Sequence, residues 1–413
     1  MASTLLQRAT TVHTDETGLA SHRVVDVRIV DGVIVEVGPS SSGAPSGTPG
    51  AGSGPTPDHV VDLDGYVLLP AAVEPHAHLD KAFLSERITN ETGDLMGAIT
   101  AMQANRHLLA VDETIERAER AARLMAANGY HAVRTHADTT VAHGLRSIEA
   151  LSAVKQRVAD VIDVEIVALC GWPMTGSAGA DQRALLRDAM QSGADIVGGV
   201  PHLEGDNDRE ATEILLQVAT DAGVAVDLHT DETLDPTALG LVDLAEMKLA
   251  GFAHAATASH CVSLGVQTAS EQQRIAELVA EADIPVIALP HTNLYLQGRG
   301  HAPMPRGLTA VAALRSAGAT VAAGADNLQD PFNPVGRACP FETAGLMVMA
   351  AHLLPHEAWV AVSAASSTAT NCEVVEIAPG SPAHLVAARA DTLREAIAFG
   401  PSDRIVWRHG RRL

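Results

Sequence analysis

The sequence predicts an α/β protein: a (β/α)8 barrel accompanied by a small β-domain that is formed by both ends of the chain. Eight apolar runs alternate with segments of helical periodicity, and shorter strand-like runs of alternating polarity precede and follow them. The 413 residues are 46% hydrophobic but only 3% aromatic. A large core is therefore expected, filled mainly by Ala, Val, Leu and Ile.

The N-terminal segment, residues 1–66, is expected to form the first part of the small β-domain. Its run VVDVRIVDGVIVEVG is interrupted by Asp31-Gly32, a pair typical of a two-residue β-hairpin turn. Residues 38–58 are rich in Gly, Pro and Ser and are expected to be a flexible surface loop. Strand character resumes at HVVDLDGYVLLPA.

The central segment, residues 67–370, is expected to form the barrel. Continuous runs of Val, Ile and Ala are typical of parallel strands that are buried on both faces. The intervening segment VDETIERAERAARLMAANG carries apolar residues at helical spacing, and Gly129 is expected to end that helix. The eight predicted strands are VLLPAAVEPHAH, HAVRTHAD, VEIVALCG, ADIVGGVPH, VAVDLHTDE, GFAHAATASH, IPVIALPHTN and TVAAGADN.

The C-terminal segment, residues 371–413, returns to short strands in PGSPAHLVAAR and DRIVWRHGRRL. The simplest interpretation is that the two chain ends form one sheet with the barrel inserted between them. Two unrelated terminal extensions are the alternative.

Charge and cysteine content exclude several function classes. The net charge of −22 should repel nucleic acid and anionic membranes. No window approaches 18 apolar residues, and the first residues lack the pattern of a signal peptide, so neither a membrane span nor secretion is expected. The four cysteines form no CxxC or zinc-finger spacing, and they are expected to be reduced thiols of a cytoplasmic protein.

Histidines and carboxylates fall repeatedly at the ends of the predicted strands. The first strand ends in His76-Ala77-His78, and residues two apart in a strand point to the same side. Such a pair alone is more often a surface or core feature than a metal site. The evidence for a metal site is therefore the whole set of strand-end residues. Its other members are His229 and Glu232 at the fifth strand, His260 at the sixth and Asp326 at the eighth.

This set predicts a metal site, because the carboxyl ends of barrel strands meet on one face. A catalytic divalent metal needs at least three N or O ligands and a position left open for water. The expected ligands are His76, His78, His229 and Asp326. Glu232 and His260 would then lie close enough to move protons. One ion, Zn²⁺ or Fe²⁺, is expected, since these ligand types suit both.

Three further histidines have two open interpretations, support of the metal ligands or packing with satisfied hydrogen bonds. They are His136 after the second strand, His202 after the fourth and His291 in the seventh.

With these residues placed, the chain resembles the amidohydrolase superfamily and, within it, the cytosine deaminase-like branch. The matching stretches run from about residue 67 to 340 and include LLPAAVEPHAHLDKAFL, NGYHAVRTHADTT, IVGGVPHLEG, DLHTDET, TASHCVSLG, LPHTNLYLQGRGHAPMPRGLTAV and AGADNLQDPFNPVG. The resemblance implies Fe²⁺ or Zn²⁺ on the four ligands, Glu232 as proton shuttle and His260 as the residue that orients or activates the attacking water. It also implies Gln297 in the pocket lining, and it leaves a homo-oligomer open.

The chain departs from the cytosine deaminases near the expected substrate. Those enzymes recognise the pyrimidine with a Gln after the third strand, where this chain has Gly171 and Trp172. Their second Asp after the metal ligand is Asn327 here. Lys81 adds a cation that either contacts the substrate or pairs with a carboxylate, and Trp172 either stacks on a planar ring or anchors its loop. These differences should change which ring fits.

The expected reaction is hydrolytic deamination of a small amino-substituted nitrogen heterocycle by a metal-activated hydroxide, a hydrolysis of a C–N bond other than a peptide bond. Asp326 would take a proton from the water, Glu232 would protonate the ring and then the leaving amine, and His260, as imidazolium, would stabilise the developing oxygen charge. The alternatives are opening of a cyclic amide and amine release from a triazine-, creatinine- or pterin-like ring. A non-catalytic scaffold is disfavoured because no expected ligand is missing.

Overall fold

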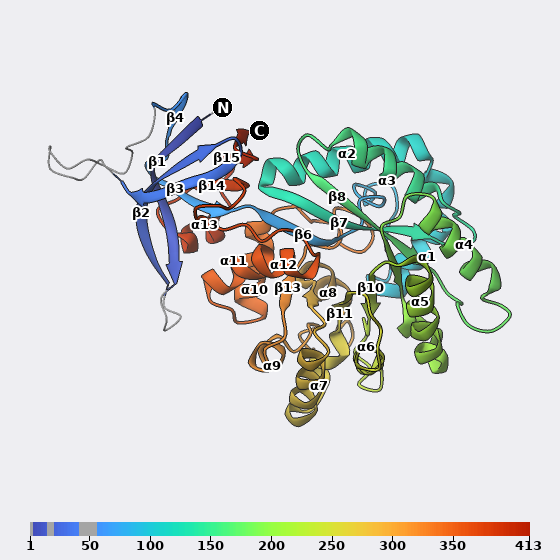
Figure 1. Cartoon of the computed structure of the whole chain (residues 1–413). Helices are drawn as coiled ribbons and strands as arrows, with labels where there is room; N and C mark the ends of the chain where they lie inside the picture. The colour runs from blue at the N-terminus through green and yellow to red at the C-terminus, as the bar shows by residue number, and fades with distance from the viewer. Residues whose placement is uncertain (1–2, 15–19, 41–55) are drawn as a thin grey trace.

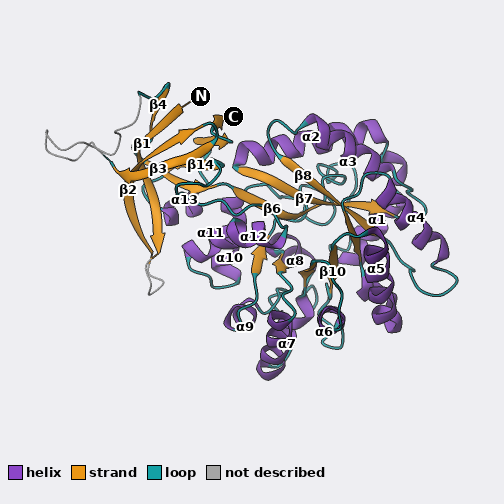
Figure 2. Cartoon of the chain, in the orientation of Figure 1, coloured by secondary structure: helices purple, strands orange, loops and turns teal. Residues whose placement is uncertain are grey.

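The computed structural model describes residues 3–14, 20–40 and 56–413, and it contains two eight-stranded sheets (Figures 1 and 2). One sheet is parallel and runs from β6 to β13 in chain order, with helices between its strands. The other combines strands from both ends of the chain. The predicted fold class is therefore confirmed. Most of the expected loop 38–58 lies outside the described residues.

The parallel sheet closes into a barrel at the predicted site. An isolated parallel bridge joins Ala77, at the end of the first barrel strand, to Asp326, just beyond the last one. The His78 amide donates to the Asp326 carbonyl at 3.2 Å, and the Asp326 amide donates to the His76 carbonyl at 3.0 Å. The barrel strands are β6 (Ala72–Ala77), β7 (Tyr130–Thr139), β8 (Asp163–Cys170), β9 (Ile196–Gly199), β10 (Val226–Thr230), β11 (Ala256–His260), β12 (Val286–Ala288) and β13 (Val321–Ala323).

Helices between the strands cover the outside of the barrel (Figure 2). In α2 the buried residues recur at helical spacing, and the left-handed Gly129, at φ 104°, ends the helix as expected. The helices up to β10 are α1 (Leu95–Ala104), η2 (Arg106–Leu108), α2 (Val111–Asn128), α3 (Arg146–Arg157), α4 (Ala180–Gln191), η3 (Pro201–Asn207) and α5 (Asp208–Ala222). Those that follow are α6 (Gly240–Leu249), η4 (Val262–Val266), α7 (Ala269–Glu281), α8 (Pro290–Leu296), α9 (Val311–Ser316), α10 (Pro340–Ala350), α11 (Pro355–Val362), α12 (Ala364–Ala369) and α13 (Leu393–Phe399). No helix in the described ranges is long and apolar enough to cross a membrane.

The small sheet has the order β16-β15-β14-β5-β1-β2-β3, with β4 paired to β1. Asp31 and Gly32 both have positive φ, 48° and 83°, as the predicted hairpin turn requires. Trp407 is 1% exposed and packs in a separate apolar core with residues from both chain ends. The strands are β1 (Ser3–Thr14), β2 (Ala20–Val30), β3 (Val33–Pro39), β4 (His59–Asp62), β5 (Tyr66–Pro70), β14 (Leu385–Arg389), β15 (Arg404–Arg408) and β16 (Arg411–Arg412).

Two predicted strands differ from the structure. The run at residues 67–78 is two strands, because β5 pairs with β14 in the small sheet and the chain then enters the barrel as β6. His291 lies in α8 and not in a strand. The predicted domain limits at residues 66 and 370 stay predictions.

A histidine stack connects the barrel to the small sheet. His131 of β7 stacks on His384, which precedes β14, with ring centroids 4.7 Å apart and planes at 20°. His384 also meets the edge of His409 at 4.2 Å. Burial lowers the pKa of His131 to about 4 and that of His384 to about 3. Both rings are therefore neutral at neutral pH.

Candidate active site

The four expected metal ligands meet at the carboxyl end of the barrel. His78 Nε2 lies 3.3 Å from Asp326 Oδ1 and 3.2 Å from His229 Nε2. His76 Nε2 lies 3.7 Å from the same Asp326 oxygen. All four side chains are buried, and the barrel closure described above holds three of them in register. Nitrogen and oxygen atoms from three strand ends thus lie around one point.

The residues fit a divalent cation. Among the described residues, His76 Nε2 and both Asp326 carboxylate oxygens are buried without a hydrogen-bond partner. Buried polar atoms in native proteins are normally satisfied, so atoms of this kind aimed at one another indicate a missing positive charge. Two overlapping groups have ligand atoms within 4.8 Å of one another, His76 with His136 and His229, and His76 with His260 and Asp326. Although neither group includes His78, its short distances to two members place it at the same centre.

A buried relay fixes the tautomer of His76. Ser259 Oγ donates to Asp227 Oδ1 at 3.1 Å, and His76 Nδ1 lies 2.9 Å from the same Ser259 oxygen. Because the serine hydroxyl already donates its only proton to the Asp227 carboxylate, His76 Nδ1 must be the donor to the Ser259 oxygen. This leaves a lone pair on His76 Nε2. Arg134 in turn donates to Asp227 Oδ2 at 2.8 Å, so the charge of the carboxylate is compensated.

Glu74 holds the two strand ends that carry ligands. Its carboxylate accepts from the His76 amide at 3.3 Å and from the Ala325 amide at 3.0 Å. Burial raises the pKa of Glu74 to about 8. Both Glu74 and Asp227 lie two residues before a ligand histidine, and the strand alternation points each pair into the barrel.

The Lys81 ammonium is hydrogen-bonded to Asp138 and to His78, one of the two expected ligands at the end of β6. It donates to Asp138 Oδ1 at 2.7 Å and to His78 Nδ1 at 2.9 Å. The Nδ1 atom of His78 is thereby held as a hydrogen-bond acceptor for the ammonium. Lys81 also lines the pocket, so the pairing with a carboxylate and a substrate contact are compatible.

Two groups that can move protons lie beside the ligands and share one partner. The Asn293 amide nitrogen lies 3.2 Å from Glu232 Oε1 and 3.0 Å from His260 Nδ1, and an amide NH2 can donate to both. Burial, with the Asp326 charge, raises the pKa of Glu232 well above its usual range. Burial lowers the pKa of His260 to about 4. His260 is therefore neutral with its proton on Nε2, which differs from the imidazolium expected from the sequence because burial penalises the charged ring.

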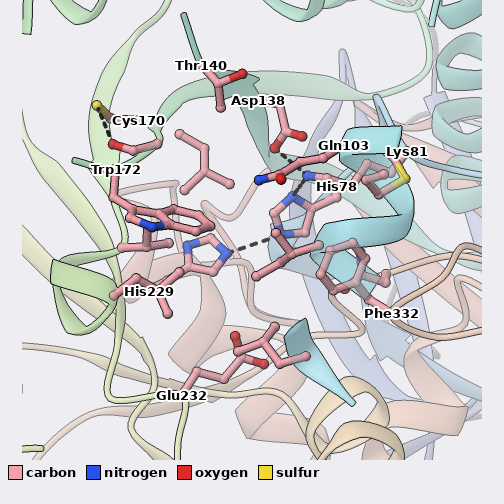
Figure 3. Close-up of a pocket in the computed structure, with 18 of the residues that line it drawn as sticks. His78, Lys81, Gln103, Asp138, Thr140, Cys170, Trp172, His229, Glu232 and Phe332 are labelled. Atoms are coloured by element: carbon pink, nitrogen blue, oxygen red, sulfur yellow. Dashed lines mark hydrogen bonds and ion pairs between the residues drawn. The ribbon is translucent and has the colours of Figure 1, made fainter. Parts of the chain in front are cut away.

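The site opens into a pocket with about 910 Å³ of empty space, its open mouth included. Figure 3 shows Trp172 and Phe332 on either side of it, and Glu232 reaching in from below. Gly171 and Asn327 also line the pocket. The Asn327 amide is hydrogen-bonded to other residues of the protein, since it donates to Asp330 and accepts from Thr292.

Gln297 does not line the pocket. Its amide donates to the Glu232 carbonyl at 3.2 Å, so it touches the backbone of that residue.

The three ambiguous histidines have different surroundings. His136 lies against His76, with ring centroids 3.9 Å apart, and neither of its nitrogens has a hydrogen-bond partner among the described residues. His202 Nδ1 donates to the His229 carbonyl at 3.1 Å, and this residue lines the pocket. His291 bonds Thr343 at 3.1 Å and does not line the pocket.

Several residues of the site were not predicted from the sequence. Asp227 and Glu74 carry a usable signal, two residues before a ligand histidine on the same strand. Gln103 and Arg106 of the α1–η2 segment line the pocket, yet they follow no strand directly. Nothing in their local sequence marks them.

The chain is similar to known proteins over most of its length. A family model described as "Amidohydrolase family" matches residues 84–413. The match begins after His76 and His78, so it does not include that pair. A pterin deaminase of Rhizobium rhizogenes is 32% identical over 393 residues, which cover 94% of this chain and 87% of the relative.

Two solved structures share the fold over nearly the whole chain. A 5-methylcytosine deaminase from Klebsiella pneumoniae, liganded with phosphonocytosine, has a TM-score of 0.85 at 28% identity and covers 99% of this chain and 97% of its own. An N-isopropylammelide isopropylaminohydrolase from Burkholderia multivorans has a TM-score of 0.80 at 26% identity and covers 100% of this chain and 98% of its own.

Proposed function

Because this chain belongs to the amidohydrolase family and acts on C–N bonds, we propose that it is a metal-dependent deaminase of an amino-substituted nitrogen heterocycle. One observation carries the proposal. Four imidazoles and a carboxylate converge beneath a pocket, and the buried carboxyl group of Glu232 stands beside them. A protonated carboxyl in this place can deliver a proton to a bound ring.

The proposed ligands are His76, His78, His229 and Asp326, and they would hold one Zn²⁺ or Fe²⁺. When bound, the ion supplies Lewis acidity that lowers the pKa of water toward neutrality. The histidine rings suit this role, because burial lowers the pKa of His76 and of His229 and keeps both neutral.

The remaining chemistry belongs to three side chains. Asp326 takes a proton from the attacking water, and Glu232 gives its proton to a ring nitrogen, so the neighbouring carbon becomes electrophilic. The neutral His260 donates from Nε2 to the oxygen that adds to this carbon, and its Nε2 lies 4.0 Å from Asp326 Oδ2. Glu232, now a carboxylate, takes the proton of the added hydroxyl group and passes it to the amine, the C–N bond breaks, and ammonia leaves. The proton held by Asp326 then returns to Glu232. Water is consumed and the ring keeps an oxo group.

For the substrate we propose a pterin-like ring. The relative named a pterin deaminase supports this substrate, because its similarity covers nearly the whole chain. The pocket lining supports it as well, because Gly171 and Trp172 leave out the glutamine amide expected for a pyrimidine and place an aromatic face there. Release of an alkylamine from a triazine is the second candidate, supported by the N-isopropylammelide relative.

We further propose a small-molecule partner only, with no nucleic acid and a cytoplasmic location. The net charge of −22 supports the first point. The four cysteines, all free thiols, support the second. A homo-oligomer stays open.

The test of the proposed function combines ammonia release with metal analysis. Enzyme loaded with Zn²⁺ or with Fe²⁺ should release ammonia from pterin faster than from cytosine, creatinine or an aminotriazine. We expect Glu232→Gln to lower kcat by about 10²- to 10⁴-fold while it retains the metal, because it removes the transferable proton and no ligand.

Glu281→Gln, at the exposed end of α7, is the matched control and should keep full turnover. Near-normal turnover by metal-loaded Glu232→Gln would refute the proton-shuttle role. Release of no ammonia from the panel by metal-loaded enzyme would refute the deaminase proposal.

A further inference from the structure

The pocket has polar groups away from the reacting centre. The α1–η2 segment contributes Gln103 and Arg106 to its wall, and Figure 3 shows Gln103 on the side away from Glu232. The two residues lie three positions apart on this segment. The same segment contributes the apolar side chains of Leu95, Ile99 and Met102. A bound ring that reacts at Glu232 thus has an apolar wall beside it and two polar side chains on that wall.

Arg106 is an uncompensated cation in this wall. Within residues 3–14, 20–40 and 56–413, its guanidinium has no hydrogen bond, ion pair or aromatic contact, and it is only partly exposed. The other basic residue of the lining, Lys81, has its ammonium 2.7 Å from Asp138 and 3.9 Å from Asp80. The positive charge available to a ligand is therefore that of Arg106.

The charge of the whole chain makes this unpaired guanidinium more informative. The sequence has 50 acidic residues against 28 basic ones. An anionic ligand would be repelled by such a surface, so a local cation is needed to bind it. A planar guanidinium can form two parallel hydrogen bonds to a carboxylate. The free Gln103 amide can add a third hydrogen bond.

We propose that Arg106, assisted by Gln103, binds a carboxylate substituent on the end of the substrate remote from the amine that leaves. The substrate class is then a two-ring aminoheterocycle that carries a carboxylate. This inference rests on the proposed deaminase function and deepens it. Arg106 acts as a specificity residue, since it contacts the substituent and not the reacting atoms.

The test compares two probes, pterin and pterin-6-carboxylate, with the metal-loaded enzyme. We expect a higher kcat/KM for the carboxylated probe. Arg106→Gln should lower the ratio of the two kcat/KM values by about 10- to 100-fold, the range of a hydrogen bond to a charged group. The change should lie mainly in KM for the carboxylated probe, because the contact exists before and during the reaction.

Arg394→Gln is the matched control, since Arg394 is also without a partner among the described residues but lies on α13 of the small domain. It should leave the ratio unchanged. Arg106→Lys should restore part of the preference. A ratio that Arg106→Gln leaves unchanged, or a wild-type enzyme that favours plain pterin, would overturn the inference while the deaminase function stands.

If metal-loaded enzyme releases no ammonia from either probe, the proposed function fails on its own. Calorimetric binding of the two probes then decides the inference. The inference is supported if pterin-6-carboxylate binds more tightly than pterin and Arg106→Gln abolishes this difference. It is overturned if both probes bind equally or undetectably.

Discussion

Ser259 shows how one hydroxyl can fix the tautomer of a proposed metal ligand. It accepts from His76 Nδ1 and donates to Asp227, so the lone pair of His76 is held on the nitrogen that faces the other ligands. Alanine at this position would leave the Asp227 oxygen without its donor and would free the His76 ring to turn. The serine lies outside the proposed ligand set and would still influence how that set binds the ion.

We expect Ser259→Ala to weaken metal binding by about 10- to 100-fold, the usual effect of removing a partner that orients a ligand. Competition with a chelator, monitored by metal analysis, measures this without any assay of turnover. Ser263→Ala is the control, because Ser263 is equally buried but bonds the Ala238 carbonyl. Equal metal affinity in both variants would contradict the relay.

At the residue scale, the sequence places the proposed ligands together more readily than the residues that support them. His76, His78, His229 and Asp326 follow the strand ends that barrel architecture brings together, and the structure places them at one centre. The protonation of His260 could not be predicted, because it depends on burial and on the Asn293 amide of helix α8. Arg106 could not be predicted either, since its place depends on how a long connection folds over the pocket.

The end of helix α2 shows how an element fixes the contact between the two sheets. Gly129 takes the left-handed conformation, and a Cβ there would lie 2.9 Å from Val386 Cγ2 on β14. The glycine is therefore needed both for the turn and for the approach of the small sheet. Gly223, at the end of α5, has φ 71° and open space around it.

This difference gives a matched pair of variants. Gly223→Ala should cost roughly 1 kcal/mol of unfolding free energy, because only the left-handed conformation is penalised. Gly129→Ala should cost about 1–3 kcal/mol more, since the methyl group also overpacks against Val386. Urea unfolding of both variants measures the two losses. Equal losses would show that the contact with β14 relaxes without cost.

At the element scale, periodicity predicts most strands and helices correctly but not the transfer between sheets. Residues 67–73, which span the change from β5 to β6, are all apolar because both strands are buried there, so hydropathy does not reveal where the chain leaves the small sheet. The Asp31-Gly32 turn was predictable because its residues encode their own conformation. Long-range pairing, such as β5 with β14, has no such local code.

At the scale of the whole molecule, the His131–His384 stack makes the junction of the two sheets sensitive to acid. Both folded-state pKa values lie below that of an unfolded histidine, about 6.5. Well above pH 6.5 these two histidines are unprotonated in both states, and their contribution to the unfolding free energy does not change with pH. As the pH falls from 6.5 toward 4, the unfolded chain takes up protons that the folded one refuses, so the unfolding free energy decreases.

We expect His384→Gln to remove part of this dependence. The stability advantage of the wild type over this variant should shrink by on the order of 1–3 kcal/mol between pH 7.5 and pH 4.5. Urea unfolding at several pH values, with the metal content held equal, measures it. His59→Gln, at an exposed position of β4, should show a constant difference. An equally constant difference for His384→Gln would rule out the stack as the acid-sensitive group.

The shared sheet also has a consequence for biosynthesis. Strands β1 to β5 leave the ribosome before the barrel does, but β5 obtains its partner β14 only after more than three hundred further residues have been made. Until then one side of β5 exposes unpaired backbone groups, which can pair with other nascent chains. A chain that stops short of β14 would contain every residue of the metal site and still present that open edge.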